Sequence, residues 1–153
     1  MAAGAAAGRA ESLTSSVASS TSGHVRAPLL LDTSVWIQHV RYGDAVVAFA
    51  LREHLAVGHV DIAGELRMEV GEVALAISEQ VLALPRIASI EAGGAIRLVD
   101  ERKLAGIGLG WTDASLILAC AASSEKVALY TLDRRMAFGA RKIGIEVVGP
   151  ANR

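Results

Sequence analysis

The sequence predicts an α/β domain of three layers, with a short, mainly parallel sheet between helices. Two short apolar runs, at residues 28–31 and 127–132, have the composition of strands that are buried on both faces. Segments with helical apolar periodicity lie between these runs, and strands that alternate with helices form parallel sheets covered on both sides. The high apolar content of 52% and the low aromatic content of 4% suit helices packed on such a sheet.

The expected elements follow one another with short connections. In chain order they are a strand at 28–31, a helix over 35–40, a helix from 44 to about 55, a strand near 57–60, a long helix from about 62 to 84, a helix over about 91–104, a helix over 113–124, a strand at 127–132, a helix over 134–142 and a short strand around 143–148. Gly64 and Gly71 locally weaken the prediction of the long helix.

Capping residues stand at several of the expected helix starts. Thr33 and Ser34 precede the first helix and are good N-cap residues. Gly43 interrupts that helix, and Asp44 after it caps the second one. Thr112 is the expected N-cap of the helix that follows the glycine-rich loop.

Residues 1–27 differ in composition from the rest of the chain. They are rich in Ala, Gly, Ser and Thr, and such a segment cannot bury enough apolar surface to offset the entropy lost on ordering. We therefore expect a disordered low-complexity extension over 1–27, followed by one domain over 28–150. The Ser-rich, acid-poor character of the extension also has some similarity to a transit peptide, and that alternative stays open.

Charge and cysteine usage narrow the classes of function. The formal net charge is −1, so local patches rather than the whole chain must hold any phosphate. The one cysteine, Cys120, excludes a disulfide framework within the monomer and lies in an apolar run typical of a core thiol. No apolar run approaches the roughly 20 residues that span a bilayer, so we expect a cytoplasmic protein without a membrane partner. The four histidines lack metal-ligand spacing, and surface or turn positions are expected for them.

Four acidic residues are the candidates for a functional site: Asp32, Glu65, Asp113 and Asp133. Asp32 and Asp133 end the two strand runs, and in open α/β sheets ligands bind just beyond the carboxyl ends of the strands. Carboxylates that lie close together raise each other's pKa unless a cation neutralises them, and a hard divalent metal ion prefers such oxygen ligands. Taken singly, each acid also fits a cap, a turn or a solvated helix face. Their joint placement favours a metal site.

A phosphatase is a competing interpretation of the first strand. The run Leu-Leu-Leu-Asp-Thr-Ser has a superficial similarity to the nucleophile motif of haloacid-dehalogenase-like phosphatases. That family requires a second Asp two residues after the first, where this chain has Ser34. No cap domain is evident either, so this interpretation ranks low.

Four stretches occur in a characteristic order and spacing: residues 30–37 (LLDTSVWI), 64–66 (GEL), 108–114 (GLGWTDA) and 130–135 (YTLDRR). Together they resemble the PIN-domain ribonucleases, and most closely the VapC toxins of bacterial toxin–antitoxin pairs. The resemblance covers about residues 29–148. It implies a PIN-like three-layer α/β/α domain.

The resemblance also implies a role for each acid. Asp32, Glu65, Asp113 and Asp133 would form an acidic pocket that holds Mg²⁺ or Mn²⁺. Asp32 and Asp113 resemble the best direct ligands. Glu65 would ligate the metal or orient a water on it, and Asp133 would complete the site directly or through water.

Residues around the four acids are assigned with alternatives. Thr33 and Thr131 are expected to hydrogen-bond a carboxylate beside the pocket, and a plain backbone cap is an equal alternative. The family pattern selects Glu65 over Glu69 and Glu72, which would form a solvated face of the same helix. Two further positions depart from the family pattern and bear on substrate preference: Gln38, where relatives often have an acid, and Ser115, where they often have His.

A basic segment follows Asp133 without an intervening acid. Arg134, Arg135 and Arg141 are the candidates for contact with RNA phosphates, and Arg134 and Arg141 share a helix face at i and i+7. A solvated helix end with favourable charges near its C-terminal dipole is an equal alternative.

The function implied by the resemblance is that of a metal-dependent endoribonuclease, the toxin of a toxin–antitoxin pair. It would cleave single-stranded RNA through metal-activated water, leaving a 5′-phosphate and a 3′-hydroxyl. The expected partners are a cognate antitoxin, the RNA substrate and a second copy of the chain in a homodimer. The alternative is a catalytically silent PIN-like module that binds RNA or protein, although four retained acids argue against it.

Overall fold

The computed structural model describes residues 26–149, so most of the prediction for 1–27 and the end of the predicted domain at 150 lie outside the described residues. Within 26–149 the elements are β1 (Leu29–Leu31), α2 (Thr33–Tyr42), α3 (Ala45–Arg52), β2 (Ala56–Val57), α4 (Val60–Met68), α5 (Glu72–Ala83), α6 (Ala92–Glu101), α7 (Trp111–Ala122), β3 (Ala128–Tyr130), α8 (Arg134–Lys142) and β4 (Val147–Val148). The order of strands and helices is the predicted one, apart from the division of one helix.

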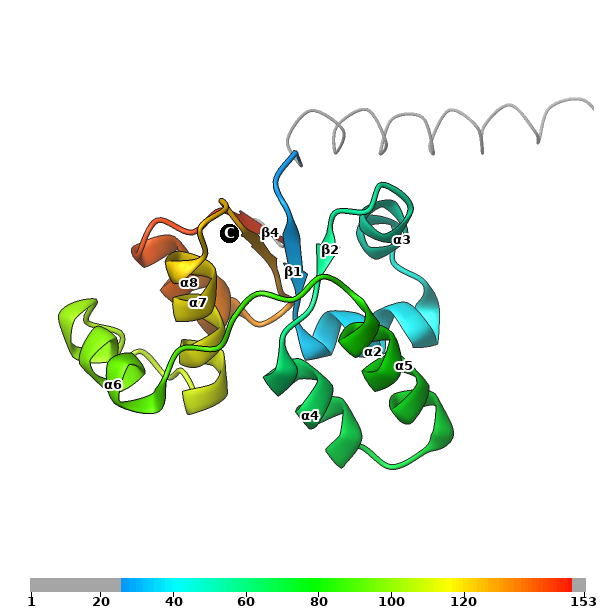
Figure 1. Cartoon of the computed structure of the whole chain (residues 1–153), viewed down its shortest axis with the longest axis horizontal. Helices are drawn as coiled ribbons and strands as arrows, with labels where there is room; N and C mark the ends of the chain where they lie inside the picture. The colour runs from blue at the N-terminus through cyan, green and yellow to red at the C-terminus, as the bar shows by residue number, and fades with distance from the viewer. Residues whose placement is uncertain (1–25, 150–153) are drawn as a thin grey trace, which may run out of the picture.

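The four strands form one parallel sheet in the order β2-β1-β3-β4. Leu29 of β1 is in register with Ala56 of β2 and with Ala128 of β3, and Leu129 pairs with Val147 of β4. Helices lie on both sides of this sheet, with α6, α7 and α8 on one side and α2 to α5 on the other (Figure 1). The predicted α/β fold with a short parallel sheet is therefore confirmed.

The central strands are the most buried part of the molecule. All three leucines of β1 are fully buried, because helices cover both faces of the sheet. Cys120 of α7 is also buried, as predicted, and burial raises the pKa of its thiol to about 12. No helix among the described residues is long and apolar enough to cross a membrane.

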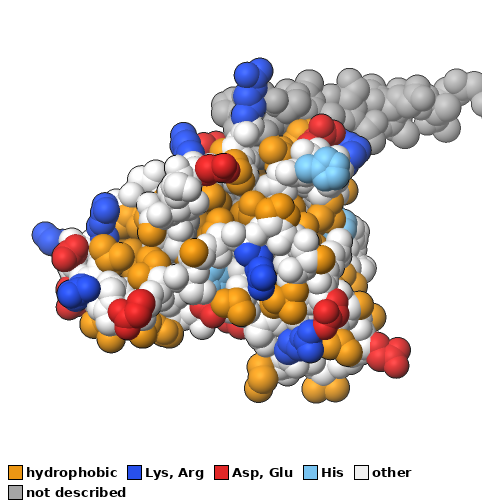
Figure 2. Space-filling model, in the orientation of Figure 1, with side chains coloured by type: hydrophobic (Ala, Val, Ile, Leu, Met, Phe, Trp, Pro, Cys, Tyr) orange, Lys and Arg blue, Asp and Glu red, His pale blue; other side chains and the backbone are white. Residues whose placement is uncertain are grey.

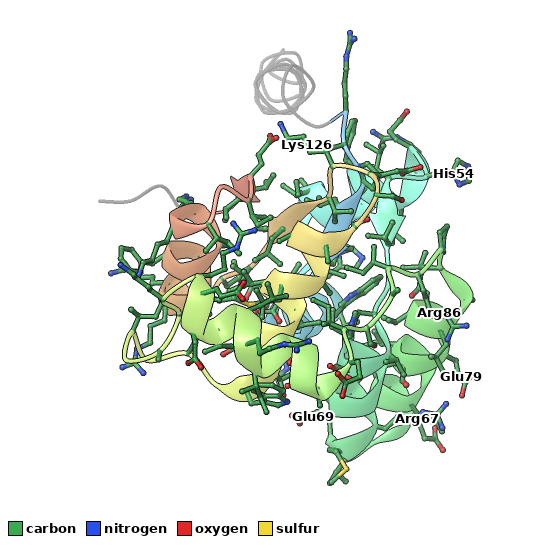
Figure 3. All side chains as sticks on the ribbon, turned by 60° about the vertical axis from the view of Figure 1, so that its left-hand side comes forward. His54, Arg67, Glu69, Glu79, Arg86 and Lys126 are labelled. Atoms are coloured by element: carbon green, nitrogen blue, oxygen red, sulfur yellow. The ribbon has the colours of Figure 1, made fainter. Side chains whose placement is uncertain are left out.

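The helix predicted from about 62 to 84 is two helices. α4 ends at Met68 and α5 begins at Glu72, and Gly71 between them has a φ of +128°, a conformation that favours glycine. The two helices pack on each other, and Arg67 and Glu79 point toward one another across the pair (Figure 3). Glu69 is only the C-cap of α4, so the predicted helix face shared by Glu65, Glu69 and Glu72 is wrong.

Two predicted helix starts are also corrected. α2 begins at Thr33, and its N-cap is Asp32, whose side chain accepts the N–H of Thr33. α7 begins at Trp111 with Gly110 as its N-cap, so Thr112 lies inside the helix. In both cases the helix begins earlier than predicted: a single residue separates α2 from the end of β1, and α7 begins directly after the glycine-rich loop, so the expected cap residues lie inside the helices.

The expectation of a surface or turn position is wrong for His59. Its side chain is 1% exposed and caps α4, with Nδ1 accepting the backbone N–H of Asp61 at 3.1 Å. Nε2 lies 3.2 Å from the hydroxyl of Ser89. Since Nδ1 accepts a hydrogen bond, Nε2 carries the hydrogen in the neutral ring and donates it to the Ser89 hydroxyl. His59 therefore ties the start of α4 to the segment that follows α5.

Candidate active site

The four predicted acids come from four different elements. Asp32 directly follows β1, whereas two residues separate Asp133 from the end of β3, and Asp133 caps α8. Asp113 lies in the first turn of α7, and Glu65 lies in the middle of α4. Because β1 and β3 are adjacent and parallel, their carboxyl ends meet at one edge of the sheet.

Asp32 is held by three hydrogen-bond donors. Its Oδ1 accepts the backbone N–H of Thr33 at 2.7 Å, and its Oδ2 accepts the hydroxyls of Ser34 at 2.8 Å and Thr131 at 2.9 Å. The side chain is only 6% exposed, so these bonds fix the carboxylate at the end of β1. The predicted contact of Thr131 with a carboxylate is confirmed. Ser34, considered in the sequence only as an argument against a phosphatase, is a further group that orients Asp32.

Glu65 is bound to the same corner of the fold through Thr33. The Thr33 hydroxyl donates to Oε2 of Glu65 at 2.5 Å, which confirms the predicted contact and joins α2 to α4. Burial raises the pKa of Glu65, and the nearby carboxylates of Asp32, Asp113 and Asp61 raise it further, against the opposing effect of the Thr33 hydrogen bond. Glu65 is therefore within electrostatic reach of two other predicted site residues.

Asp113 faces the remaining acids from α7. Burial raises its pKa, the backbone N–H of Gly110 at 3.3 Å opposes that rise, and the charges of Asp32 and Asp133 add to it. The effects on Glu65 and Asp113 together link all four predicted acids. The structure thus brings the predicted set to one edge of the sheet.

Asp133 has a second role that is purely structural. Its Oδ1 accepts the N–H groups of Arg135 at 2.7 Å and Met136 at 3.1 Å, which caps α8. Its own N–H donates to the Thr131 hydroxyl at 3.0 Å. Asp133 is exposed, so it lies at the rim of the group, whereas Asp32 lies at its base.

The donor chemistry of this acidic group fits a hard divalent cation. The four side chains offer only carboxylate oxygens, which Mg²⁺ and Mn²⁺ prefer, and no histidine or cysteine belongs to the group. The raised pKa values of Glu65 and Asp113 show that their ionised forms are held at a cost that a cation would relieve. Among residues 26–149 no three acidic, histidine or cysteine side chains are already arranged as a metal site, so closure around an ion would require side-chain movement.

The predicted phosphate-binding arginines lie at both ends of α8. Arg134 and Arg135 are exposed directly after Asp133, and Arg141 is half-buried near the other end. Arg135 also lies against Gly108 of the glycine-rich loop, where an added Cβ would be 3.0 Å from its Cδ. On the face drawn in Figure 2, charged side chains of both signs are scattered over the surface, as the net charge of −1 leads one to expect. Contact with phosphate stays a prediction.

A hollow of about 630 Å³ lies elsewhere in the fold and is not part of the acidic group. Pro28 and Val127, which precede β1 and β3, are among the residues that line it. It therefore opens at the amino ends of the strands, whereas the acids follow the carboxyl ends. The chemistry of the carboxylates, rather than the size of the hollow, identifies the candidate site.

Comparisons with known proteins find similarity to a ribonuclease. No protein-family model matches the chain. The chain is 32% identical over 120 residues to Ribonuclease VapC32 of Mycobacterium tuberculosis, in strain CDC 1551 / Oshkosh and in strain ATCC 25618 / H37Rv. Each alignment covers 76% of this chain and 94% of the relative.

Proposed function

The chain belongs to the VapC family of PIN-domain ribonucleases, and from this we propose that it is a metal-dependent endoribonuclease, the toxin of a VapBC-type toxin–antitoxin pair. One observation carries the proposal. Asp32 is buried, oriented by three donors at the carboxyl end of β1, and electrostatically coupled to Glu65 and Asp113. A buried carboxylate group without a balancing cation is unfavourable in a purely structural role and suits a metal-binding one.

The proposed roles follow from the position of each acid. Asp32, at the end of β1, and Asp113, in the first turn of α7, would hold Mg²⁺ or Mn²⁺ directly, as the family resemblance implies. Glu65 would complete the group from α4, and exposed Asp133 would meet the ion or its hydration shell at the rim. A bound divalent cation supplies Lewis acidity and neutralises charge that develops on the phosphodiester.

The residues around the acids have supporting tasks in this proposal. Ser34 and Thr131 restrain Asp32 and Thr33 restrains Glu65 through hydrogen bonds, so fewer side chains have to be ordered when an ion and substrate bind.

The proposed protein partner is a small antitoxin that covers or obstructs the acidic pocket. The apolar surface that it would bury is a hollow of about 290 Å³ between α2 and α5, where Val40, Val70 and Val73 are exposed. The hollow is lined by the later part of α2, whose N-cap is Asp32, and by Glu69, the C-cap of the helix that carries Glu65. A partner seated on it would have to extend along these helices to obstruct the pocket. An amphipathic helix is the occupant that fits such a groove.

The proposal is tested by RNA cleavage with purified protein. Single-stranded and structured RNA would be incubated with Mg²⁺, with Mn²⁺ and with chelator, in parallel for the wild type, Asp32→Asn and the matched surface variant Asp100→Asn. We expect metal-dependent cleavage by the wild type and Asp100→Asn, and a loss of at least about a hundredfold for Asp32→Asn.

Three outcomes would contradict the proposal. Cleavage that persists in chelator or in Asp32→Asn would exclude the metal-dependent mechanism. The absence of cleavage of any RNA would favour the catalytically silent binding module. Hydrolysis of a simple phosphomonoester in place of RNA would favour a phosphatase.

A further inference from the structure

A half-exposed aromatic side chain lies at the centre of a cationic face on α8. Phe138 is 52% exposed, although large apolar side chains normally turn toward the core. Its neighbours at i−4, i−3, i+3 and i+4 are Arg134, Arg135, Arg141 and Lys142. Residues at these spacings are adjacent on a helix surface, so a cation occupies every neighbouring position around Phe138.

The packing of α8 leaves this face turned outward. Met136, Ala137 and Ala140 are buried against the core, and Gly139 fits against the glycine-rich loop. A Cβ at Gly139 would be only 2.8 Å from Leu109, so α8 lies too close to that loop to rotate. The packing of α8 therefore determines that the Phe138 side chain is exposed.

Two of the four cations on this face, Arg134 and Arg135, form none of the ion pairs recorded among residues 26–149. α8 itself contains no acidic residue, and its N-cap is Asp133. Arg134 and Arg135 are exposed, and Lys142 donates to the backbone carbonyl of Lys103 rather than to a carboxylate. The guanidinium groups of Arg134 and Arg135 are therefore available to a partner that carries negative groups.

The position of the face indicates which partner that is. α8 starts at Asp133, so the face begins at the rim of the acidic pocket and extends along nine residues, about 13 Å at 1.5 Å per residue. A second copy of the chain is a poor occupant, because a two-fold contact would place the same cations opposite one another. A polyanion with flat apolar groups, in continuity with the pocket, matches both the charge and the aromatic ring.

We propose that the cationic face of α8 binds the single-stranded RNA segment flanking the cleavage site, with phosphates on Arg134 and Arg135 and a base stacked on Phe138. This inference rests on the proposed function, since it places the face beside a nuclease pocket. Base stacking on an aromatic ring contributes about 1–3 kcal/mol per base, which corresponds to about a 5- to 150-fold change in affinity. Duplex RNA keeps its bases stacked inside the helix and gains nothing from Phe138.

The test measures binding in chelator, so that it is independent of cleavage. Fluorescence anisotropy of a labelled single-stranded RNA and of a duplex of the same sequence would be recorded with wild type, Phe138→Ala, Phe138→Trp and Arg134→Gln. Ile96→Ala, an exposed apolar position on α6, is the matched control. We expect Phe138→Ala to weaken single-strand binding about tenfold and duplex binding little, while Phe138→Trp and Ile96→Ala retain it. Arg134→Gln should lower the salt slope by about one.

Each of the remaining outcomes overturns the inference. Single-strand binding by Phe138→Ala at wild-type strength would show that no base stacks there. A dimer that dissociates in Phe138→Ala, measured by sedimentation, would assign the face to self-association. The two proposals fail separately. If the wild type cleaves RNA with metal but Phe138→Ala binds single-stranded RNA as tightly as the wild type, only the α8 inference fails. If the protein cleaves no RNA but Phe138→Ala weakens single-strand binding, only the nuclease proposal fails.

Discussion

The Thr131 hydroxyl donates to Oδ2 of Asp32 at 2.9 Å, joining two residues that are 99 positions apart in the chain. The hydroxyl oxygen of Thr131 also accepts the backbone N–H of Asp133 at 3.0 Å. One fully buried hydroxyl therefore positions two of the four site acids, at the point where β1 and β3 end side by side. The geometry of the site depends on this connection.

Removal of the Thr131 hydroxyl tests that dependence. In Thr131→Val the shape is kept while Asp32 loses a donor, so we expect a loss of about 1–2 kcal/mol in the free energy of unfolding. Ribonuclease kcat should fall about tenfold or more because the carboxylate is less well oriented. Thr131→Ser keeps the hydroxyl and should recover most of both. Urea denaturation and cleavage kinetics measure the two effects, and equal losses for Val and Ser would refute the role of the hydroxyl.

The raised pKa of Glu65 predicts how stability varies with pH in the absence of metal. The native state binds the Glu65 proton more tightly than the unfolded state does, so between the ordinary pKa of 4.5 and the raised one, stability falls as pH rises. Glu65→Gln removes this dependence and still accepts the Thr33 hydroxyl. We expect the variant to be more stable than wild type at neutral pH in chelator, with the difference vanishing below pH 4.5.

Urea titrations at several pH values measure this difference. Glu69→Gln, at the exposed C-cap of α4, is the matched control and should follow the wild type. A wild type more stable than Glu65→Gln at neutral pH without metal would show that the carboxylates do not repel one another as inferred.

Cation binding should be visible as a gain in thermal stability. An ion that binds only the native state increases the free energy of unfolding, by about 2.7 kcal/mol at a hundredfold excess over Kd, and so raises the unfolding temperature. We expect Mg²⁺ and Mn²⁺ to stabilise the wild type and Glu101→Gln, an exposed acid at the end of α6. Asp113→Asn should show little of this shift. A shift of the same size in Asp113→Asn would place the ion elsewhere.

His59 should contribute to stability through the start of α4. His59→Ala removes the cap on Asp61 and the bond to Ser89 and leaves a cavity, so we expect a loss of about 2–4 kcal/mol. Burial lowers the pKa of His59, so its contribution is complete above the ordinary pKa of 6.5 and declines as pH falls below it. Exposed His54→Asn, which tolerates the φ of +55° there, serves as the control in urea denaturation. Equal stability of the two variants would contradict the assignment.

Local signals were sufficient for much of the fold. The helix over 134–142 was predicted with its observed bounds, since Asp133 caps it and Gly144 follows it. The break at Gly71 was missed as a helix end because apolar residues continue on both sides of it. It becomes evident only when α5 folds back on α4, where Ser78 donates to the carbonyl of Ala63. His59 was misplaced for a similar reason, since its partner Ser89 is 30 residues away.

The sequence by itself determined the class of the sheet, the order of the four acids and the position of Asp32, Asp113 and Asp133 at strand ends and helix starts, because these follow from periodicity and capping along the chain. Only the tertiary structure decided that Ser34 and Thr131 hold Asp32, that Thr33 binds Glu65, and that Phe138 faces outward among cations. Those relationships depend on which strands pair and how closely helices approach. Such contacts are made between residues distant in the chain, and no local pattern encodes them.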